Sequence, residues 1–433
     1  MTTTNLTTTN HSDGFEPDPE LLDQVLEMLT CALASNTQQQ QQALQAMEEH
    51  KNNPDFLLYL TYIFSNYTKQ GTAVQQIAGL TLKRFIDTNW ESLQPATRES
   101  IEQHLYTALI TSSPNNFLQK TAANAISSIV RATGLRSIPQ LPQFICSVLD
   151  EHNENNTGSL TANNKNQYHT IRLGILTVLI LLAEDSSEEW HDPELNNPLL
   201  EVINRLLGII SNTKYDAERL AALRIFHIFG NKVYNHIPIE LWKEYFSILG
   251  DIASNSTITN NSNKLRAALL ESFAVIVKRR WSVVAEDIVP IIEFTLATTE
   301  DTDEIVLTTA CATWPTIFKA LNVADTKIND ENRKKENANP QTYFTDDTFN
   351  DNEQSIWLRP HLEAFEVYLP RLIPLLLNHM VWTNKSLAEL PASARDNNDK
   401  FDKDEIRPYI FQGKQGQAGG ITQDDEEDED DED

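Results

Sequence analysis

One stripe of small and apolar residues recurs along this chain and restricts the folds that it can adopt. The segment Pro54–Trp90 predicts two amphipathic helices, separated by a polar turn at Gly71 and Thr72. In the second helix the stripe occupies offsets 0, 3, 4, 8 and 11, which is one face of a helix with a period of 3.6 residues. Its members are Val74, Ile77, Ala78, Leu82 and Phe85. Such a hairpin cannot bury its apolar faces alone and needs neighbours of the same kind.

The same offsets recur in five further segments, anchored at Leu118, Ile171, Ala217, Leu265 and Val306. Successive anchors lie 44, 53, 46, 48 and 41 residues apart, close to the roughly 40–47 residues of HEAT and armadillo units. The sequence therefore predicts an all-α fold, a HEAT-repeat α-solenoid of antiparallel helical hairpins with a disordered acidic C-terminal loop or tail. We expect the stacked pairs to share one hydrophobic spine and to present an acidic inner wall to another protein. The small residue at offset 4 marks close approach of two helices at Ala78, Ala122, Ala221 and Ala310.

Changes in composition divide the chain into five segments. The Thr- and Asn-rich start is predicted to be disordered, and the polar, Asn- and Lys-rich segment after the sixth stripe is predicted to be an insertion or long loop. A helix carrying Leu44 and Met47 is expected in the first repeat. The segments are a disordered tail at 1–18, HEAT repeats 1–7 at 19–321, a polar insertion at 322–356, the first helix of an incomplete eighth repeat at 357–382, and an acidic disordered tail at 383–433.

Negative charge dominates the chain, with a formal net charge of −28. Ten of these charges stand in one run, which leaves −18 on the remainder. An acidic body repels nucleic acid and anionic membrane, so basic proteins or basic segments are the expected partners. The run itself is either a solvated solubility tail or a mobile polyanion that binds a basic protein surface. It consists of Asp424, Asp425, Glu426, Glu427, Asp428, Glu429, Asp430, Asp431, Glu432 and Asp433.

Cysteine usage and apolar runs favour a reduced, soluble, intracellular protein. Cys31, Cys146 and Cys311 are odd in number, far apart and within predicted helices, where buried thiols are expected. Met1–Glu20 lacks the basic and apolar regions of a signal peptide. The longest apolar run, Leu173–Ala183, is shorter than the roughly 20 residues that span a bilayer.

No constellation of catalytic or metal-binding residues is visible, so we predict neither an enzyme nor a cofactor or metal site. Gly413–Gly416 lacks the spacing of a phosphate-binding loop and reads as a linker. His227 lies in an apolar helix, where a satisfied core histidine is expected. The run Lys278–Arg280 is either a basic binding patch or a group of cations favoured at a helix C-terminus by the helix dipole.

Several collinear motifs resemble the N-terminal half of karyopherin-β (importin-β) nuclear transport receptors, most closely the transportin branch. Asn53–Phe56, Tyr59-Leu60 and Ala78–Lys83 resemble the importin-β N-terminal domain, which the segment 43–110 would form. That domain usually carries Leu-Lys-Asn where this chain has Leu82-Lys83-Arg84. Tyr368–Leu376 resembles the first helix of the eighth repeat, and an acidic stretch follows it, as in that family's long acidic loop.

The resemblance implies a shuttling receptor, present in cytoplasm and nucleus, that binds the GTP form of the small GTPase Ran on a concave face built by second helices. It places Ran contacts near Lys83 and Arg84, and it makes Asp424–Asp433 the start of a loop that couples Ran binding to cargo release. Localisation-signal cargo and nucleoporins are the further partners that it implies, with cargo held mainly by C-terminal repeats. The alternative is a HEAT scaffold subunit of a multiprotein complex, indifferent to nucleotide state.

Overall fold

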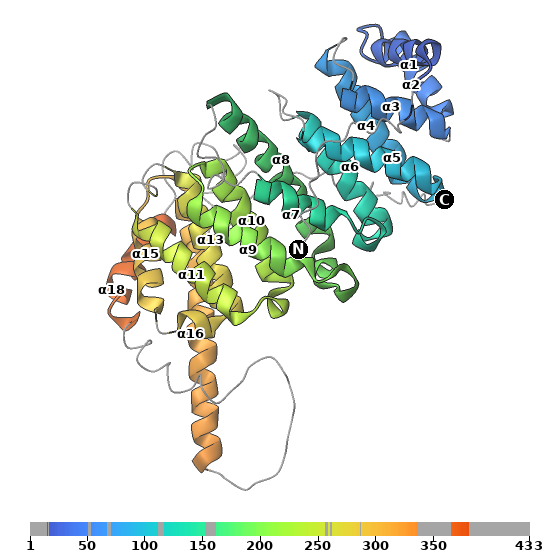
Figure 1. The fold of residues 1–433 in the computed structure, drawn as a ribbon. Coiled ribbons are helices and arrows are strands. Elements are labelled where there is room, and N and C mark those ends of the chain that lie inside the picture. Colours follow the sequence, from blue (N-terminus) through green and yellow to red (C-terminus); the bar gives the residue numbers. More distant parts are fainter. Residues whose placement is uncertain are drawn as a thin grey trace, which may run out of the picture. The chain divides into compact units, whose positions relative to one another are not determined.

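Helices alone make up the secondary structure in the described part of this computed structural model (Figure 1). The structure describes residues 15, 17–50, 53–66, 71–110, 117–151, 162–255, 259, 262–285, 287–336 and 365–380. No strand occurs within these ranges, so the prediction of an all-α fold is confirmed.

The helices follow one another as seven pairs, each with a first and a second helix in contact. The first helices are α1 (Pro19–Ala32), α3 (Pro54–Asn66), α5 (Pro95–Ile110), α7 (Leu141–Glu151), α9 (Pro198–Asn212), α11 (Ile239–Ser254) and α15 (Ile288–Thr299). The second helices are α2 (Thr37–Glu49), α4 (Thr72–Asn89), α6 (Phe117–Thr133), α8 (Ala162–Ser186), α10 (Asp216–Lys232), α13 (Asn263–Arg279) and α16 (Glu304–Glu336). After them comes α18 (Leu369–Met380).

Neighbouring pairs stack on one another in chain order. Each second helix packs against the next second helix, in the order α4, α6, α8, α10, α13 and α16. First helices make the corresponding contacts between α3 and α5, between α7 and α9, and between α9 and α11. One hydrophobic cluster continues through the stack from Val25 to Leu372. This is the two-layered HEAT-type solenoid that the repeated stripe predicts.

Local signals in the sequence set where several helices begin. Proline, whose fixed φ suits the first turn, opens α1, α3, α5 and α9. Asp18 caps α1, because its carboxylate accepts hydrogen bonds from the backbone N–H groups of Glu20 (2.8 Å) and Leu21 (3.2 Å).

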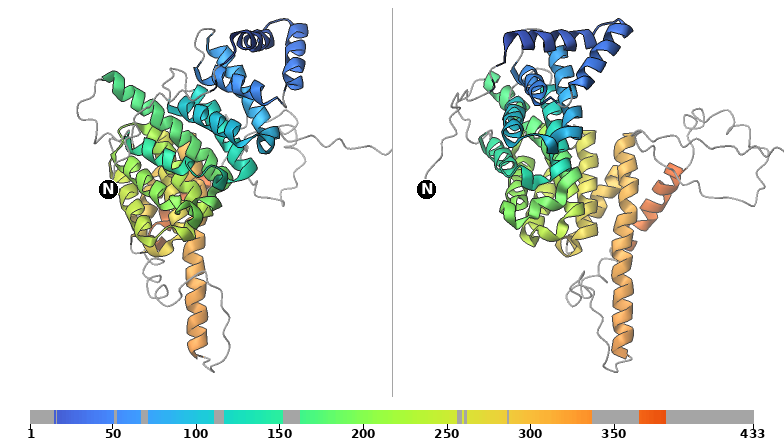
Figure 2. Two further views of the ribbon diagram at one scale, coloured as in Figure 1. Left: turned by 45° about the vertical axis from the view of Figure 1, so that its right-hand side comes forward. Right: turned by 90° about the vertical axis from the view of Figure 1, so that its right-hand side faces the viewer.

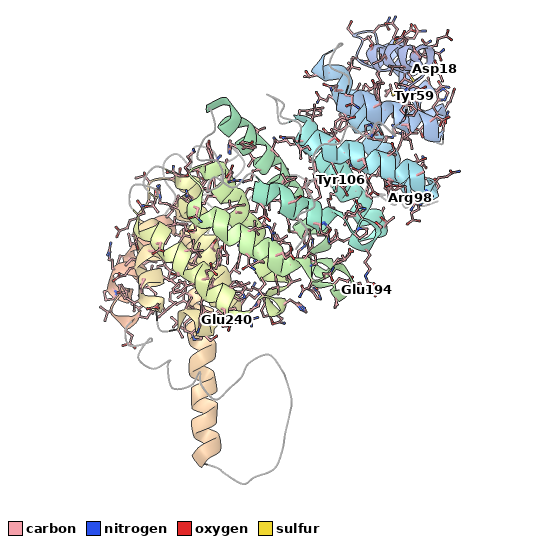
Figure 3. All side chains as sticks on the ribbon, viewed as in Figure 1. Asp18, Tyr59, Arg98, Tyr106, Glu194 and Glu240 are labelled. Atoms are coloured by element: carbon pink, nitrogen blue, oxygen red, sulfur yellow. The ribbon has the colours of Figure 1, made fainter. Side chains whose placement is uncertain are left out.

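The ordered N-terminal packing reaches into residues that the sequence analysis assigned to a disordered tail. The Asp18 N–H donates to the hydroxyl of Tyr59 at 3.0 Å (Figure 3), and the ring of Phe15 meets that of Tyr59 edge to face at 4.8 Å. The 1–18 boundary was therefore too long at its C-terminal end, because a single aromatic residue gives no periodic signal.

Burial confirms the stripe in five of its six copies and corrects the fourth. In α10 the anchor Ala217 is exposed, whereas Glu218 and Ala222 are fully buried. The true register starts one residue later, at Glu218, and it places Phe226 and Phe229 at the last two offsets. The pattern missed this register because the buried anchor is a glutamate. With the corrected anchor, successive spacings become 44, 53, 47, 47 and 41 residues.

In the first repeat, the expected helix carrying Leu44 and Met47 is present as α2, but only one of these two residues is buried. Ala43 and Met47 fill the buried positions of α2, and Leu44 is 50 % exposed. An amphipathic helix of low apolar content allows two neighbouring stripes, and Leu44 belongs to the one that faces away from the core.

The second helix of the last pair runs further than the sequence pattern indicated. Helix α16 continues to Glu336 (Figure 2), past Leu321, where a polar insertion was expected to begin. The segment 322–336 contains no glycine or proline, and it places Asp330 four residues before Lys334. No helix-breaking residue therefore interrupts the chain here, and its polar composition alone did not locate the end of the helix. The remainder of the expected insertion, to residue 356, lies outside the described residues.

Close approach of helices makes Gly79 a sensitive position of the second-helix layer. A Cβ atom at Gly79 would lie 2.6 Å from the ring of Phe64 on α3 and 2.7 Å from Cγ2 of Thr121 on α6. Gly208 in α9 offers a matched contrast, since a Cβ atom there meets nothing within 4 Å.

We expect Gly79→Ala to destabilise the protein by about 1–3 kcal/mol, because the added methyl group overpacks the junction of three helices. Gly208→Ala should stabilise it by up to about 1 kcal/mol through helix propensity alone. Urea-unfolding midpoints of both variants, followed by far-UV circular dichroism, test this. A shift of the same sign in the two variants would contradict the close packing at Gly79.

Candidate protein-binding surface on the second helices

A buried or half-buried polar side chain follows the stripe anchor in five of the second helices. Gln75, Gln119, Arg172, Arg219 and Arg266 all occupy the position directly after the anchor. Four of them donate to a backbone carbonyl near the end of a first helix or in the turn that follows it. The acceptors are Phe64 O for Gln75 (3.2 Å), Leu109 O for Gln119 (3.0 Å), Ile210 O for Arg219 (3.0 Å) and Thr259 O for Arg266 (2.8 Å). Carbonyls at a helix end have no partner within their helix, so these bonds satisfy them and tie the two helices of a pair together.

Arg172, the fifth member of this series, binds the neighbouring repeat instead. Its guanidinium donates to Glu218 Oε2 at 2.9 Å, and both side chains are almost fully buried. Glu218 also accepts hydrogen bonds from His169 Nδ1 (2.7 Å) and from the hydroxyl of Thr213 (2.8 Å). Burial alone raises the pKa of Glu218, but the bonds from His169 and Thr213 and the charge of Arg172 outweigh it, so this pKa lies below its ordinary value. Glu218 is thus a buried carboxylate that joins α8 to α10.

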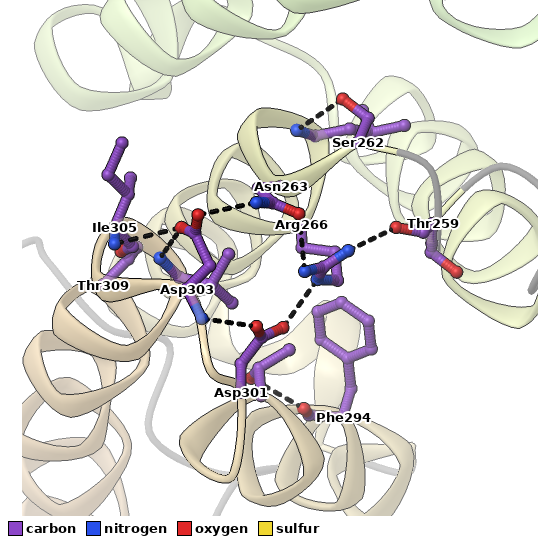
Figure 4. A network of polar contacts seen from close by, with 12 residues as sticks. Thr259, Ser262, Asn263, Arg266, Phe294, Asp301, Asp303, Ile305 and Thr309 are labelled. Carbon is purple, nitrogen blue, oxygen red and sulfur yellow. Dashed lines mark hydrogen bonds and ion pairs between the residues drawn. The ribbon is translucent and has the colours of Figure 1, made fainter.

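A second polar network joins α13 to the start of α16 (Figure 4). Arg266 Nε donates to Asp301 at 2.8 Å, and the side-chain amide of Asn263 donates to Asp303 at 2.6 Å. Asp303 caps α16 by accepting from the N–H groups of Ile305 and Val306. These backbone bonds, that of Val306 first, hold the pKa of Asp303 below its usual range.

The two cations that the sequence analysis singled out, Lys83 and Arg84, lie on α4 and reach different neighbours. Lys83 Nζ is 3.1 Å from Asp87 on the same helix, and Asp87 also binds Arg131 of α6 at 3.1 Å. Arg84 pairs with Glu48 of α2 at 2.9 Å and is exposed. The structure therefore brings Lys83 and Arg84 together on a surface that crosses three second helices. The other predicted contact residues, Asp424–Asp433, lie outside the described residues.

Two exposed leucines accompany these cations, and the sequence analysis did not identify them as surface residues. Leu44 stands one helical turn before Glu48, and Leu80 one turn before Arg84, so the ion pair between α2 and α4 puts both leucines on one face. Each leucine is 50 % exposed. Apolar side chains rimmed by charged ones are typical of a protein interface. We call Leu44, Leu80, Lys83 and Arg84 the α2–α4 surface.

Charge is distributed unequally between the two layers. The seven second helices contain 18 Lys or Arg residues and 13 Asp or Glu residues. The seven first helices contain 3 basic and 13 acidic residues. The acidic excess of the helices therefore lies in the first-helix layer, and the expected acidic inner wall stays a prediction. The net charge of the whole chain did not reveal this difference between the layers, because it adds the charges of both.

Within the described ranges, no group of three or more His, Cys, Asp and Glu side chains is arranged to hold a metal ion. Among the same residues, no helix combines the length and apolarity needed to cross a membrane. Cys146 is buried, and burial raises the pKa of its thiol to about 11, which keeps it protonated and unreactive.

Comparison with known proteins agrees with this arrangement. The family model of the Importin-beta N-terminal domain matches residues 41–111, which cover most of α2 and all of α3 to α5. Importin subunit beta-2 of Schizosaccharomyces pombe is 23 % identical over 415 residues, covering 93 % of this chain and 38 % of that protein. Transportin-1 of Mus musculus is 21 % identical over 403 residues, covering 92 % of this chain and 38 % of its own. The chain thus spans less than two fifths of the length of these relatives.

Solved structures share the fold at low sequence identity. A Kap95p structure, in which Kap95p binding induces the switch loops of RanGDP to adopt the GTP-bound conformation, matches with a TM-score of 0.54 and 15 % identity over 86 % of this chain and 39 % of that one. Kap121p matches with a TM-score of 0.51 and 16 % identity over 80 % of this chain and 33 % of that one.

The stack of helix pairs and its exposed second-helix surface define a class, the HEAT-repeat solenoid proteins that bind other proteins along their length. Within this class the chain is similar to karyopherin-β proteins, and its residues 41–111 match the Importin-beta N-terminal domain. Its similarity is to the importin β-2 and transportin members of that family.

We expect Glu218→Gln to destabilise the protein by about 3 kcal/mol at pH 7, because it leaves Arg172 buried without a carboxylate. Glu201→Gln is the control, since Glu201 is 63 % exposed and pairs with Arg205 at 3.6 Å; its effect should stay within about 0.5 kcal/mol.

The loss caused by Glu218→Gln should also depend on pH in a defined direction. The pKa of Glu218 is lowered in the folded state, so its stabilisation is complete above the ordinary value of 4.5 and fades as the pH falls below it. Urea midpoints at pH 7 and pH 3.5 measure both effects. An equal loss in the two glutamine variants, or a loss that does not change with pH, would contradict the role of Glu218.

Proposed function

We propose that this chain is the Ran-binding part of a nuclear transport receptor of the transportin type, and that the α2–α4 surface contacts the GTP form of Ran. The observation that carries the proposal is the pair of exposed leucines, Leu44 and Leu80, beside Lys83 and Arg84. All four residues of this surface fall within the segment 41–111 matched by the Importin-beta N-terminal domain.

The mechanism is coupled binding without catalysis. Ran in its GTP form and cargo with a localisation signal bind the same receptor, and each lowers the affinity for the other. The acidic run Asp424–Asp433 belongs to the loop that transmits this coupling, and nucleoporins are further partners. Hydrolysis of GTP on Ran supplies the free energy, so the receptor needs no catalytic group. Such a protein shuttles between cytoplasm and nucleus.

Support for these partners comes from structures of related proteins. The Kap95p structure concerns RanGDP, and further neighbours are a Kap95:Nup1 complex and Kap121p bound to Nup53p or to Ste12p. These partners are those of Kap95p and Kap121p, and we propose partners of the same kinds for this chain.

The alternative is a HEAT-repeat scaffold subunit that holds a complex together regardless of nucleotide. A continuous core with layers of opposite charge also suits such a scaffold. The two functions differ in one measurable respect, because only the receptor distinguishes the nucleotide bound to Ran.

We expect the full chain to retain Ran loaded with a non-hydrolysable GTP analogue and to release Ran loaded with GDP. Combining Leu80→Ala with Lys83→Ala should weaken binding at least tenfold, which is about 1.4 kcal/mol, because it removes an apolar contact and a charge from one interface. Ile305→Ala is the matched control, since Ile305 is 57 % exposed on the distant second helix α16.

Isothermal titration calorimetry with each Ran form and each variant measures these affinities. Equal retention of both Ran forms favours the scaffold, and retention of neither rejects the Ran assignment. Loss of affinity in Ile305→Ala as large as in the double variant would reject the location of the contact.

A further inference from the structure

Cations gather where the second helices α10 and α13 end. Lys232 closes α10, and the next turn, η6 (Tyr234–His236), carries Tyr234. The guanidinium carbons of Arg279 and Arg280, at the end of α13, lie 4.9 and 5.2 Å from the centroid of the Tyr234 ring. Arg280 also donates to the Tyr234 carbonyl at 2.6 Å. We call Lys232, Tyr234, Lys278, Arg279 and Arg280 the turn-end cluster.

The turn-end cluster has no carboxylate of its own in the described part of the chain. Most arginines of the described helices pair with Asp or Glu, as Arg131, Arg224 and Arg371 do. None of the four cations of the cluster makes such a pair with a described residue. The Nε atoms of Arg279 and Arg280 are buried and have no hydrogen-bond partner there.

The helix dipole accounts for only part of this arrangement. A cation in the last turn of a helix is favoured, and Lys232 and Lys278 stand in such turns. Lys232 also places its charge at the C-terminal end of α8, because its ammonium donates to the carbonyls of Ala183 and Glu184 in the last turn of that helix. The dipole does not explain why Arg279 and Arg280 are both held over one aromatic ring.

Held guanidinium groups bind carboxylates well, because their donors are already fixed in position and a carboxylate accepts two hydrogen bonds at once. We propose that the turn-end cluster is a docking site for an acidic peptide segment of a partner protein. The site lies on the basic second-helix layer, far along the chain from the α2–α4 surface. The proposal of a docking site at the turn-end cluster holds whether or not Ran binds the α2–α4 surface.

Two features favour an acidic peptide over a nucleic acid. The first-helix layer carries 13 acidic residues against 3 basic ones, and the chain as a whole has a net charge of −28, so a long polyanion is repelled beyond the cluster itself. Nucleic acids also gain affinity by stacking bases on aromatic rings. The ring of Tyr234 is already engaged by two guanidinium groups.

Fluorescence anisotropy of the full chain with a fluorescein-labelled octapeptide of alternating Asp and Glu tests the proposal. We expect Lys278→Gln combined with Arg279→Gln to weaken binding at least tenfold, and raising the salt from 50 to 200 mM to weaken it steeply. The control is Lys120→Gln combined with Lys264→Gln, which removes two exposed cations of the same layer and should change the affinity less than twofold.

Lys278→Gln alone separates binding from folding, because Lys278 is exposed and makes no ion pair with a described residue. It should weaken peptide binding about threefold without moving the urea midpoint. Equal losses in the test and control pairs would overturn the site. Tighter binding of an eight-nucleotide single strand, lost in the same variant, would assign it to nucleic acid. Stronger peptide binding after all carboxylates of 424–433 are changed to amides would make that run the occupant and overturn the assignment to a partner.

Discussion

The bond between a buried polar side chain and the end of a first helix is the interaction on which the repeats depend. A helix end buried inside a stack leaves carbonyl groups without partners, and each unsatisfied group costs about 1–3 kcal/mol. Gln75 and Gln119 satisfy such carbonyls in the early repeats, and Arg219 and Arg266 do so later. Arginine has more donors than glutamine, so the later side chains also reach a further partner, as Arg266 reaches Asp301. The residue directly after the stripe anchor can therefore both tie together the two helices of its own repeat and bond to the next repeat.

The sequence predicts the repeated helices well because burial imposes a period on apolar residues. It predicts the polar interior poorly, since a search for apolar anchors rejects Glu218, the residue on which the register of α10 depends. The sequence nonetheless contains a sign of the correct register, because Arg219 follows Glu218 as Arg172 follows Ile171. A search that accepted a charged anchor before an arginine would have predicted that the stripe of α10 starts at Glu218. Helix α16 shows the converse error, because its sequence beyond Leu321 is mostly polar and offered no apolar period from which to predict a helix.

Surface properties were harder to predict than the core, for a different physical reason. Whether Leu44 is buried depends on which of two adjacent stripes faces α1, and composition does not decide that. The sign of charge on each layer depends on assigning every charged residue to a first or second helix, which net charge conceals. Lys83 and Arg84 could be singled out by motif, but their partners Glu48 and Asp87 follow only from the packing of α2, α4 and α6. The assignment of Asp424–Asp433 remains a prediction.

Two kinds of polar contact cross from one repeat to the next, and they have different consequences. The pair between Arg172 and Glu218 is buried, so separating α8 from α10 there would strand two charges. The pairs between Arg84 and Glu48 and between Arg131 and Asp87 are largely exposed, and each contributes about 1 kcal/mol or less. These exposed pairs therefore add little resistance to a change in the spacing of the helices that they join, and the buried packing of α4 against α6 holds that junction. At the α8–α10 junction the buried ion pair adds to the apolar packing, so a displacement there would break both.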